Sequence, residues 1–324
     1  MAGYAPGMDL RIFTEPQQGA DHADLLAVAR AARDGGFSAF FRSDHLLAMG
    51  RAGLPGPTES FVSLGAIAAL VPDIRLGTLV TSATFRHPSM TAIAAATVDD
   101  ISGGRLELGI GSGWFEAEHR AYGLDFGGSF GERFDRLTEQ LEIITGLWAT
   151  PIGATFDHDG RYYTVTDAPG LPKPRQTDAA GRPHLPIIIG GHGPRRTPAL
   201  AARFADEFNV AFADLELTTT QFGRVRRACE AAGRDPGSLV YSAAHTLCVG
   251  ADQTQLRHRA AAIGKTVEQA RESACAGTVA QVLDTIGKWS AAGVQRVYLQ
   301  VLDLADLDQI ALVAERILPA VRDL

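Results

Sequence analysis

Short apolar runs alternate with longer amphipathic stretches along most of the chain. The short runs end at polar or glycine residues, as buried strands do, whereas the longer stretches repeat apolar residues at helical spacings of three and four. The predicted strands are residues 10–13, 39–42, 74–80, 105–110, 186–189, 207–210, 240–249 and 296–301. The predicted helices are residues 23–33, 61–70, 89–101, 130–148, 197–204, 215–232, 254–263, 278–292 and 307–321.

The alternation is interrupted once, after the strongly amphipathic stretch 130–148. The segment from about 150 to 185 is rich in proline, glycine and aspartate, and its residues 156–165 predict a hairpin around Asp159-Gly160. A long irregular insert in a compact fold is usually a lid or a binding loop. We therefore expect this insert to close over a site.

Eight strand–helix units fit a closed parallel barrel better than an open doubly wound sheet. The run 186–189 is continuously apolar, as a strand buried on both faces should be. No internal repeat or low-complexity tract divides the chain. The sequence thus predicts an α/β fold, a (β/α)8 TIM barrel with an insertion before the fifth strand, with residues 1–324 as a single domain.

Composition and charge exclude some classes of function. Acidic residues outnumber basic ones by 37 to 30, giving a net charge of −7, which argues against nucleic-acid binding. Cys229, Cys248 and Cys275 form no C-x-x-C pair, so neither a disulfide framework nor a zinc site is predicted. The longest apolar run, near residues 62–71, is too short to cross a bilayer. We expect a cytoplasmic protein without a signal peptide, membrane association or a bound metal.

Candidate chemistry lies where predicted strands end, because a barrel gathers its catalytic groups at the carboxyl ends of the strands. His45 follows the second strand and is placed to move protons near neutral pH. An N-cap Asp44 followed by a surface histidine remains the alternative. After the third strand, the small hydroxyl residues from Thr81 are suited to contact a planar cofactor, or simply form a polar loop before the next helix.

Two glycine-rich segments follow the fourth and fifth strands. The first, from Gly109 to Gly113, lacks the last glycine of a dinucleotide fingerprint because Trp114 stands there, yet it allows close backbone approach to a ligand. Glu116 and His119 have the spacing of a metal pair, but the motif occurs once, and a solvated helix face is predicted. The second segment, Gly190-Gly191-His192-Gly193, leads into a helix and suits a phosphate group. A tight turn is the alternative.

Together these segments resemble the luciferase-like superfamily, most closely its coenzyme F420 (deazaflavin) branch. The resemblance runs from about Leu10 to the carboxyl terminus, and the order and spacing of its segments are more specific than any one of them. It is carried by residues 43–46, 76–88, 105–114 and 186–191, with Gly160-Arg161-Tyr162-Tyr163 of the insert similar to the family's own insert.

The resemblance implies a ring system bound at the carboxyl mouth of the barrel and His45 as the proton-transferring residue. It also implies a non-proline cis peptide at Leu79-Val80. The walls of the substrate pocket would include Trp114 and Phe85, although both are equally compatible with core packing. The implied cofactor-binding residues are Asp44, Leu79, Val80, Thr81, Ser82, Gly111, Ser112, Gly113, Gly190, Gly191, His192 and Gly193.

The chain departs from the family's sugar-phosphate dehydrogenases at one position. Those enzymes carry a glutamate proton donor just after the fourth-strand glycines, where this chain has Trp114, which argues against glucose 6-phosphate as substrate. The resemblance implies hydride transfer between F420 and a small organic substrate of the alcohol, imine or activated-alkene class, in a homodimer. An FMN-dependent monooxygenase and a non-catalytic flavin-binding barrel are the alternatives.

Overall fold

A ring of eight parallel strands forms the centre of the molecule. The computed structural model describes residues 7–50, 52–272 and 275–322. Within them, each strand of the ring pairs with the next, and β8 also pairs with β9, which closes the barrel. The ring consists of β1 (Asp9–Thr14), β2 (Ala39–Arg42), β3 (Arg75–Ser82), β4 (Leu106–Gly111), β7 (Ile187–Gly190), β8 (Glu207–Ala211), β9 (Val240–Gly250) and β11 (Arg296–Val301). The predicted (β/α)8 TIM barrel is confirmed.

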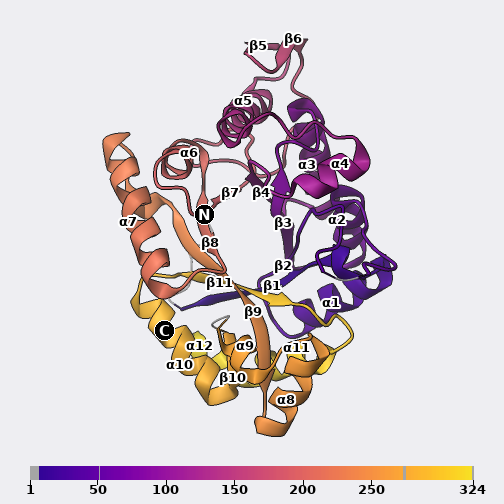
Figure 1. The fold of residues 1–324 in the computed structure, drawn as a ribbon. Helices are drawn as coiled ribbons and strands as arrows, with labels where there is room; N and C mark the ends of the chain where they lie inside the picture. The colour runs from indigo at the N-terminus through magenta and orange to yellow at the C-terminus, as the bar shows by residue number, and fades with distance from the viewer. Residues whose placement is uncertain (1–6, 51, 273–274, 323–324) are drawn as a thin grey trace.

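Helices surround this ring on the outside (Figure 1). They comprise α1 (His22–Asp34), α2 (Ser60–Leu70), α3 (Pro88–Ser102), α4 (Glu116–Tyr122), α5 (Phe130–Ala149), α6 (Arg196–Phe204), α7 (Leu215–Ala231), α8 (Gln253–Ala262), α9 (Val267–Arg271), α10 (Val279–Ala291), α11 (Leu307–Arg316) and α12 (Leu318–Val321), with short 3-10 turns at Pro16–Gln18 and Pro236–Ser238. No helix within the described ranges is long and apolar enough to span a membrane.

The helix boundaries follow from local capping chemistry. Helix α3 begins at Pro88, and the side chain of His87 accepts a hydrogen bond from the Ser89 N–H, which satisfies one of the free donors of the first turn. The same helix ends at Gly103, which adopts a left-handed conformation with φ 72° that glycine tolerates at no steric cost. At α5, Ser129 caps the first turn by accepting from Glu132 N–H.

The insert contains the predicted hairpin, formed by β5 (Phe156–Asp159) and β6 (Thr164–Ala168), which pair antiparallel. The hairpin projects beyond α5, away from the centre of the ring (Figure 1). It is held there by Glu139 of α5, whose carboxylate accepts hydrogen bonds from the backbone of Arg161, Tyr162 and Tyr163. The insert is therefore anchored to the outer wall of the barrel.

Some elements differ from the sequence-based prediction. Strand β10 (Cys275–Thr278) was not predicted and pairs with the carboxyl end of β9 outside the ring. Helix α9 was also not predicted, and α4 was predicted only as a solvated helix face carrying Glu116 and His119. The predicted helix 307–321 is two helices, because the chain changes direction at Ile317, whose φ of −108° and ψ of −51° separate α11 from α12.

The interior of the ring changes character along its axis. At the amino end, the buried Arg11 donates to Glu107 at 2.6 Å, and the buried Arg296 is paired with Glu207. Towards the carboxyl end, the ring is filled by apolar side chains such as Phe41. The polar groups for a site at the carboxyl mouth come from the last residues of the strands, such as Thr81 and Ser82 of β3, and from the loops that follow the strands.

Candidate functional site

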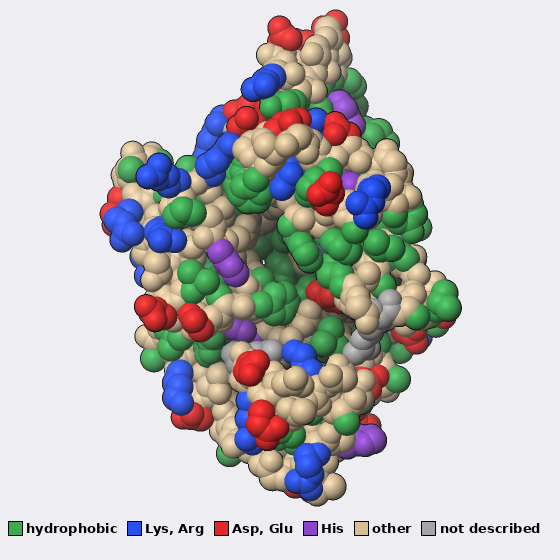
Figure 2. All heavy atoms as spheres, in the orientation of Figure 1, with side chains coloured by type: hydrophobic (Ala, Val, Ile, Leu, Met, Phe, Trp, Pro, Cys, Tyr) green, Lys and Arg blue, Asp and Glu red, His purple; other side chains and the backbone are tan. Residues whose placement is uncertain are grey.

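A cavity of about 700 Å³ opens at the carboxyl ends of the strands. In Figure 2 the cavity is the hollow at the centre of the face, inside the ring of strands, with mainly hydrophobic side chains around it. This volume lies within the range typical of ligand-binding pockets. A second cavity of about 730 Å³ lies at the other end of the barrel, against the charged residues described above.

Every residue that the sequence assigned to the site lines the cavity at the carboxyl mouth. The set comprises Asp44, His45, Leu79, Val80, Thr81, Ser82, Phe85, Gly111, Ser112, Gly113, Trp114, Gly190, Gly191, His192 and Gly193. They come from the carboxyl ends of β3, β4 and β7 and from the segments that follow β2, β3, β4 and β7. The structure thus brings the candidates together, and their roles in binding and catalysis stay predictions.

His45 is held by a buried carboxylate that the sequence did not indicate. Its Nδ1 lies 3.1 Å from Oε1 of Glu118, and the other oxygen of this carboxylate accepts from the backbone N–H of Leu46 at 2.8 Å. Glu118 is 1% exposed. Because an ionised carboxylate can only accept hydrogen bonds, the Nδ1 of a neutral His45 carries the proton, and Nε2 carries the lone pair.

Aromatic rings surround His45 at the mouth of the cavity. The ring of Trp114 meets the imidazole edge-on at a centroid distance of 5.6 Å and stacks on Phe115 at 5.3 Å. Trp114 is 64% exposed, so it is part of the cavity rim and not of the hydrophobic core. Phe85 lines the cavity too, but its ring also packs against His119 at 5.0 Å.

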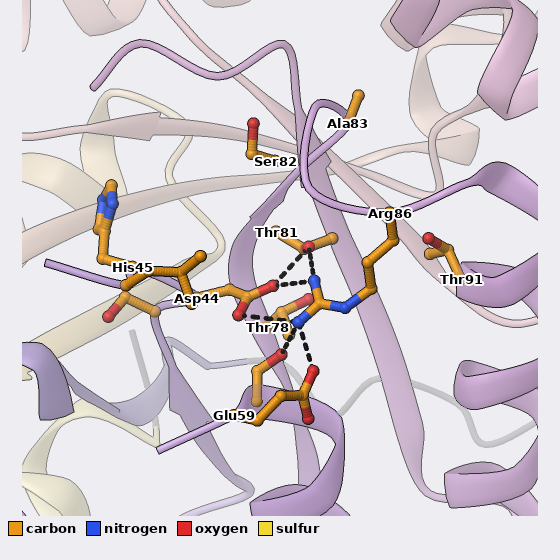
Figure 3. Close-up of polar contacts among 12 residues, drawn as sticks. Asp44, His45, Glu59, Thr78, Thr81, Ser82, Ala83, Arg86 and Thr91 are labelled. Atoms are coloured by element: carbon orange, nitrogen blue, oxygen red, sulfur yellow. Dashed lines mark hydrogen bonds and ion pairs between the residues drawn. The ribbon is translucent and has the colours of Figure 1, made fainter. Parts of the chain in front are cut away.

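Asp44 lines the cavity, and its carboxylate is bound to neighbouring protein groups. Its buried carboxylate accepts from the Thr81 hydroxyl at 2.6 Å and from Arg86 at 2.5 Å. Figure 3 shows the carboxylate directed towards these two residues, with the ring of His45 pointing away from it. Burial disfavours the charged form of Arg86, but the carboxylates of Asp44 and Glu59 outweigh it and raise the pKa of Arg86 above its ordinary value. Asp44 therefore fixes the end of β3.

The backbone around the cavity has two unusual features. The peptide bond between Leu79 and Val80 is cis, as the family resemblance predicted. The glycine segments also lie close to their neighbours: a Cβ on Gly113, which has φ +79°, would stand 2.3 Å from Ser82 Oγ, and one on Gly190 would stand 2.8 Å from the carbonyl oxygen of Asn209. Larger residues would displace these groups, so both segments need glycine.

Comparison with known proteins agrees with this arrangement. The family model described as luciferase-like monooxygenase matches residues 8–316. The chain belongs to this luciferase-like family. The pyrimidine monooxygenase RutA of Escherichia coli K12 is 32% identical over 187 residues, which cover 56% of this chain and 46% of RutA. The chain thus matches about half the length of this curated relative.

Solved structures show the same fold at low sequence identity. An F420-dependent secondary alcohol dehydrogenase in complex with an F420–acetone adduct has a TM-score of 0.83 and 19% identity, covering 98% of this chain and 100% of that one. A riboflavin lyase (RcaE) with modified FMN and riboflavin has a TM-score of 0.76 and 15% identity, covering 98% of this chain and 91% of that one. Both are similar to this luciferase-like chain over nearly its whole length.

The main residues that the sequence reasoning missed are Glu118 and His119 on α4. The motif containing Glu116 and His119 was interpreted as a solvated helix face. Glu116 is indeed exposed, but His119 is 1% exposed, so that prediction is wrong for the histidine. A signal was present: Phe115, Glu118 and His119 are spaced by three and four residues, and so share one face of a helix.

The insert does not contribute to the cavity. None of residues 150–185 is among those that line it, and the hairpin is bound to the outer side of α5. The expectation that the insert closes over the site is therefore not met. Access to the cavity is instead bordered by loop residues such as Trp114, Phe212 and Met49.

Proposed function

We propose that this luciferase-like chain is an F420-dependent oxidoreductase that transfers a hydride between the deazaflavin and a small organic substrate of the alcohol, imine or activated-alkene class. The observation that carries the proposal is His45 at the mouth of an apolar cavity, with its Nδ1 bound to the buried Glu118. The similarity in fold to an alcohol dehydrogenase that binds F420 supports the choice of coenzyme.

The cavity has the features that a flat ring system with a phosphate-bearing side chain requires. Leu79, Val80 and Ala244 supply apolar walls, and the hydroxyl groups of Thr81 and Ser82 supply polar contacts. The glycines at 111 and 113 allow close backbone approach, and the segment from Gly190 to Gly193 leads into α6, where free N–H groups suit a phosphate. When bound, the coenzyme supplies or accepts the hydride, as cofactors carry the redox chemistry in such enzymes.

His45 moves the proton that accompanies the hydride. In the oxidising direction, Nε2 of the neutral imidazole accepts the proton of a substrate hydroxyl, and the Glu118 carboxylate stabilises the imidazolium that forms. In the reducing direction, the protonated Nε2 donates. General acid–base help of this kind contributes about 10²–10⁴-fold to the rate. The aromatic pair Trp114 and Phe115 beside His45 limits the access of water to the ring.

Titration of the purified protein with F420 and with FMN tests the choice of coenzyme. We expect F420 to bind and to be reduced in the presence of a short-chain alcohol. His45→Ala should retain the dissociation constant for F420 and lose about 10²–10⁴-fold in turnover. His258→Ala, at an exposed position on α8, is the matched control and should behave like the parent protein. Unchanged turnover in His45→Ala would remove this residue from the mechanism.

A second candidate is an FMN-dependent monooxygenase on the same barrel. The 32% identity with the pyrimidine monooxygenase RutA favours it, although the match covers about half of each chain. The same titration separates the two candidates. Tight binding of FMN, with oxygen consumed in the presence of a reductant, would reject the F420 proposal, whereas binding of either coenzyme without turnover would point to a non-catalytic flavin-binding barrel.

A further inference from the structure

A chain of hydrogen bonds leads from the cavity wall to a second, buried histidine. Ser82 Oγ lies 2.6 Å from Thr84 Oγ1, which lies 2.6 Å from His119 Nε2. On the other side of the ring, His119 Nδ1 lies 2.9 Å from the carbonyl oxygen of Phe115. Of these residues only Ser82 lines the cavity, and His119 is 1% exposed.

The carbonyl of Phe115 fixes the direction of every hydrogen bond in this chain. A carbonyl oxygen only accepts, so Nδ1 of a neutral His119 carries the proton and Nε2 must accept from the Thr84 hydroxyl. Because the Thr84 proton is then engaged, Ser82 must donate its own proton to Thr84. Ser82 consequently presents no donor to the cavity, only an oxygen lone pair, although its other lone pair also receives a long contact from Thr84 N–H at 3.4 Å.

We propose that Ser82, Thr84 and His119 form a proton relay that gives the cavity a second base besides His45. An acidic ring N–H of the reduced coenzyme donates its proton to Ser82 Oγ, Ser82 passes its own proton to Thr84, and Thr84 passes its own to His119 Nε2. Each hydroxyl loses one proton and gains one, no electron changes place, and the ligand becomes an anion beside an imidazolium. The inference rests on the coenzyme-binding role proposed above.

Two further observations are consistent with a relay that exchanges protons with the cavity only at Ser82. The backbone of Gly113 covers the two hydroxyls, since a Cβ there would stand 2.3 Å from Ser82 Oγ and 2.9 Å from Thr84 Oγ1. The rings of Phe85 and Phe126 pack on His119 at 5.0 and 4.5 Å, which separates the imidazole from solvent.

Charged groups of both signs lie around the buried ring of His119. Asp125, in the loop after α4, is attracted by a protonated His119, and the pKa of Asp125 lies below its ordinary value, chiefly through hydrogen bonds from Gly127 and Arg136.

On α4 itself, Glu116 is exposed and Glu118 is engaged by His45, while Arg120 adds a positive charge. Arg133 of α5 adds a second positive charge, with its guanidinium carbon 3.9 Å from the ring centroid of Phe126, which packs on His119. Negative and positive charges are thus both present around His119, and the Asp125 carboxylate is the one that would attract an imidazolium there.

Histidine NMR on the full-length ¹⁵N-labelled protein tests the relay directly, with the signals of His119 assigned through their loss in His119→Gln. In the free protein at pH 8, we expect the neutral Nδ1–H form. Dithionite-reduced F420 or FMN, whichever binds, should convert His119 to the imidazolium. This conversion should be lost in Thr84→Val and retained in Thr84→Ser, which keeps the hydroxyl. Affinity for the reduced coenzyme should fall roughly ten-fold in Thr84→Val.

A second variant and the results that would refute the relay complete the test. Ser82→Ala breaks the relay at its cavity end and should also keep His119 neutral, which guards against a folding defect of Thr84→Val. A purely structural network would change stability in these variants and leave the protonation of His119 with coenzyme unchanged, which overturns the relay. If neither coenzyme binds, the proposed function fails. The relay is then judged on the free protein, where an Nε2–H form of His119 would refute the deduced bond directions.

Discussion

The carboxylate of Glu118 and the imidazole of His45 meet across two loops of the barrel, with 3.1 Å between Oε1 and Nδ1. Glu118 belongs to α4, which follows β4, whereas His45 follows β2. Both oxygens of the carboxylate contact protein groups, because Oε2 receives the Leu46 N–H as well as contacting the ring. The position of Glu118 indicates that it orients His45 and stabilises its positive charge.

Replacement of Glu118 by glutamine should therefore reduce turnover without abolishing coenzyme binding. The amide oxygen can still accept from Leu46 N–H, but the amide nitrogen presents donors to Nδ1 and so favours the wrong tautomer of His45. We expect a loss of about 10²–10⁴-fold in single-turnover rate with a near-constant dissociation constant, measured by stopped-flow absorbance and by titration. Glu116→Gln, on the exposed side of the same helix, should act like the parent chain. Equal rates for the two variants would contradict the assigned role.

The ion pair between Asp44 and Arg86 should be a strong structural constraint on the third strand. Both groups are largely buried, so Asp44→Asn leaves the guanidinium without its main partner and should lower the free energy of unfolding by about 3–5 kcal/mol. The double variant with Arg86→Met should lose less than the sum of the two single variants. Urea unfolding measures all four proteins, and additive losses would show that the two residues are not coupled.

The outer faces of α2 and α3 expose a patch of apolar side chains. Val62 and Leu70 of α2 are 74% and 50% exposed, and Met90, Ile93 and Ile101 of α3 are 58%, 39% and 47% exposed. The two helices pack side by side, so the residues form one surface. The outward positions between them, such as Ala66, Ala69 and Thr97, carry no charge.

We propose that a second copy of the chain covers this patch. A two-fold axis brings the same uncharged surface together from both copies, so no separate complementary face is needed. Ile93→Asp should shift the protein from dimer to monomer in light scattering coupled to size-exclusion chromatography. Ile152→Asp, at an 82% exposed position of the insert, is the control and should leave the mass unchanged. A monomeric parent protein would refute the proposal, as would a dimer that survives the Ile93 substitution.

Acid should destabilise the fold through His245 of β9. Burial against Trp289 lowers the pKa of His245 from an ordinary 6.5 to about 4. Between these pH values the unfolded chain binds a proton at His245 that the folded chain does not. The stability that depends on a neutral His245 is therefore fully present above pH 6.5 and is lost as the pH falls to 4. The loss amounts to up to roughly 3 kcal/mol. Urea unfolding between pH 4.5 and 7.5 should show this slope, and His245→Phe should reduce it. An identical slope in the variant would show that other groups cause the effect.

The barrel could be predicted from the sequence because parallel strands that are buried on both faces consist of nearly continuous apolar runs. Residues 39–42 and 296–301 were predicted with the bounds that β2 and β11 have. Strand β10 was not predicted because Cys275–Thr278 contains alanine and glycine and lies outside the ring, where pairing with β9 determines its conformation. The burial of α4 was missed because the helix is short and polar, and its burial depends on the loops that it covers.

For the site, topology predicted which segments would gather and the family resemblance implied the residues within them, but neither predicted where each side chain points. Strand ends converge in any such barrel, so the segments with His45, Ser82 and Gly113 had to meet. Whether Asp44 faced a ligand or a cation depended on Arg86, which lies far along the chain and folds back beside it. The partner of His45 depended in the same way on how α4 lies across the mouth.

Helix α4 presents Glu118 to one loop and His119 to another, from adjacent positions in the chain. One residue inserted or deleted between Trp114 and Glu118 would rotate both side chains by about 100° around the helix axis and detach the two histidine assemblies at once. Over evolution, the length of this stretch should tolerate far less variation than the hairpin of the insert. Redesign of the pocket should accordingly exchange side chains at its rim and leave the number of residues there untouched.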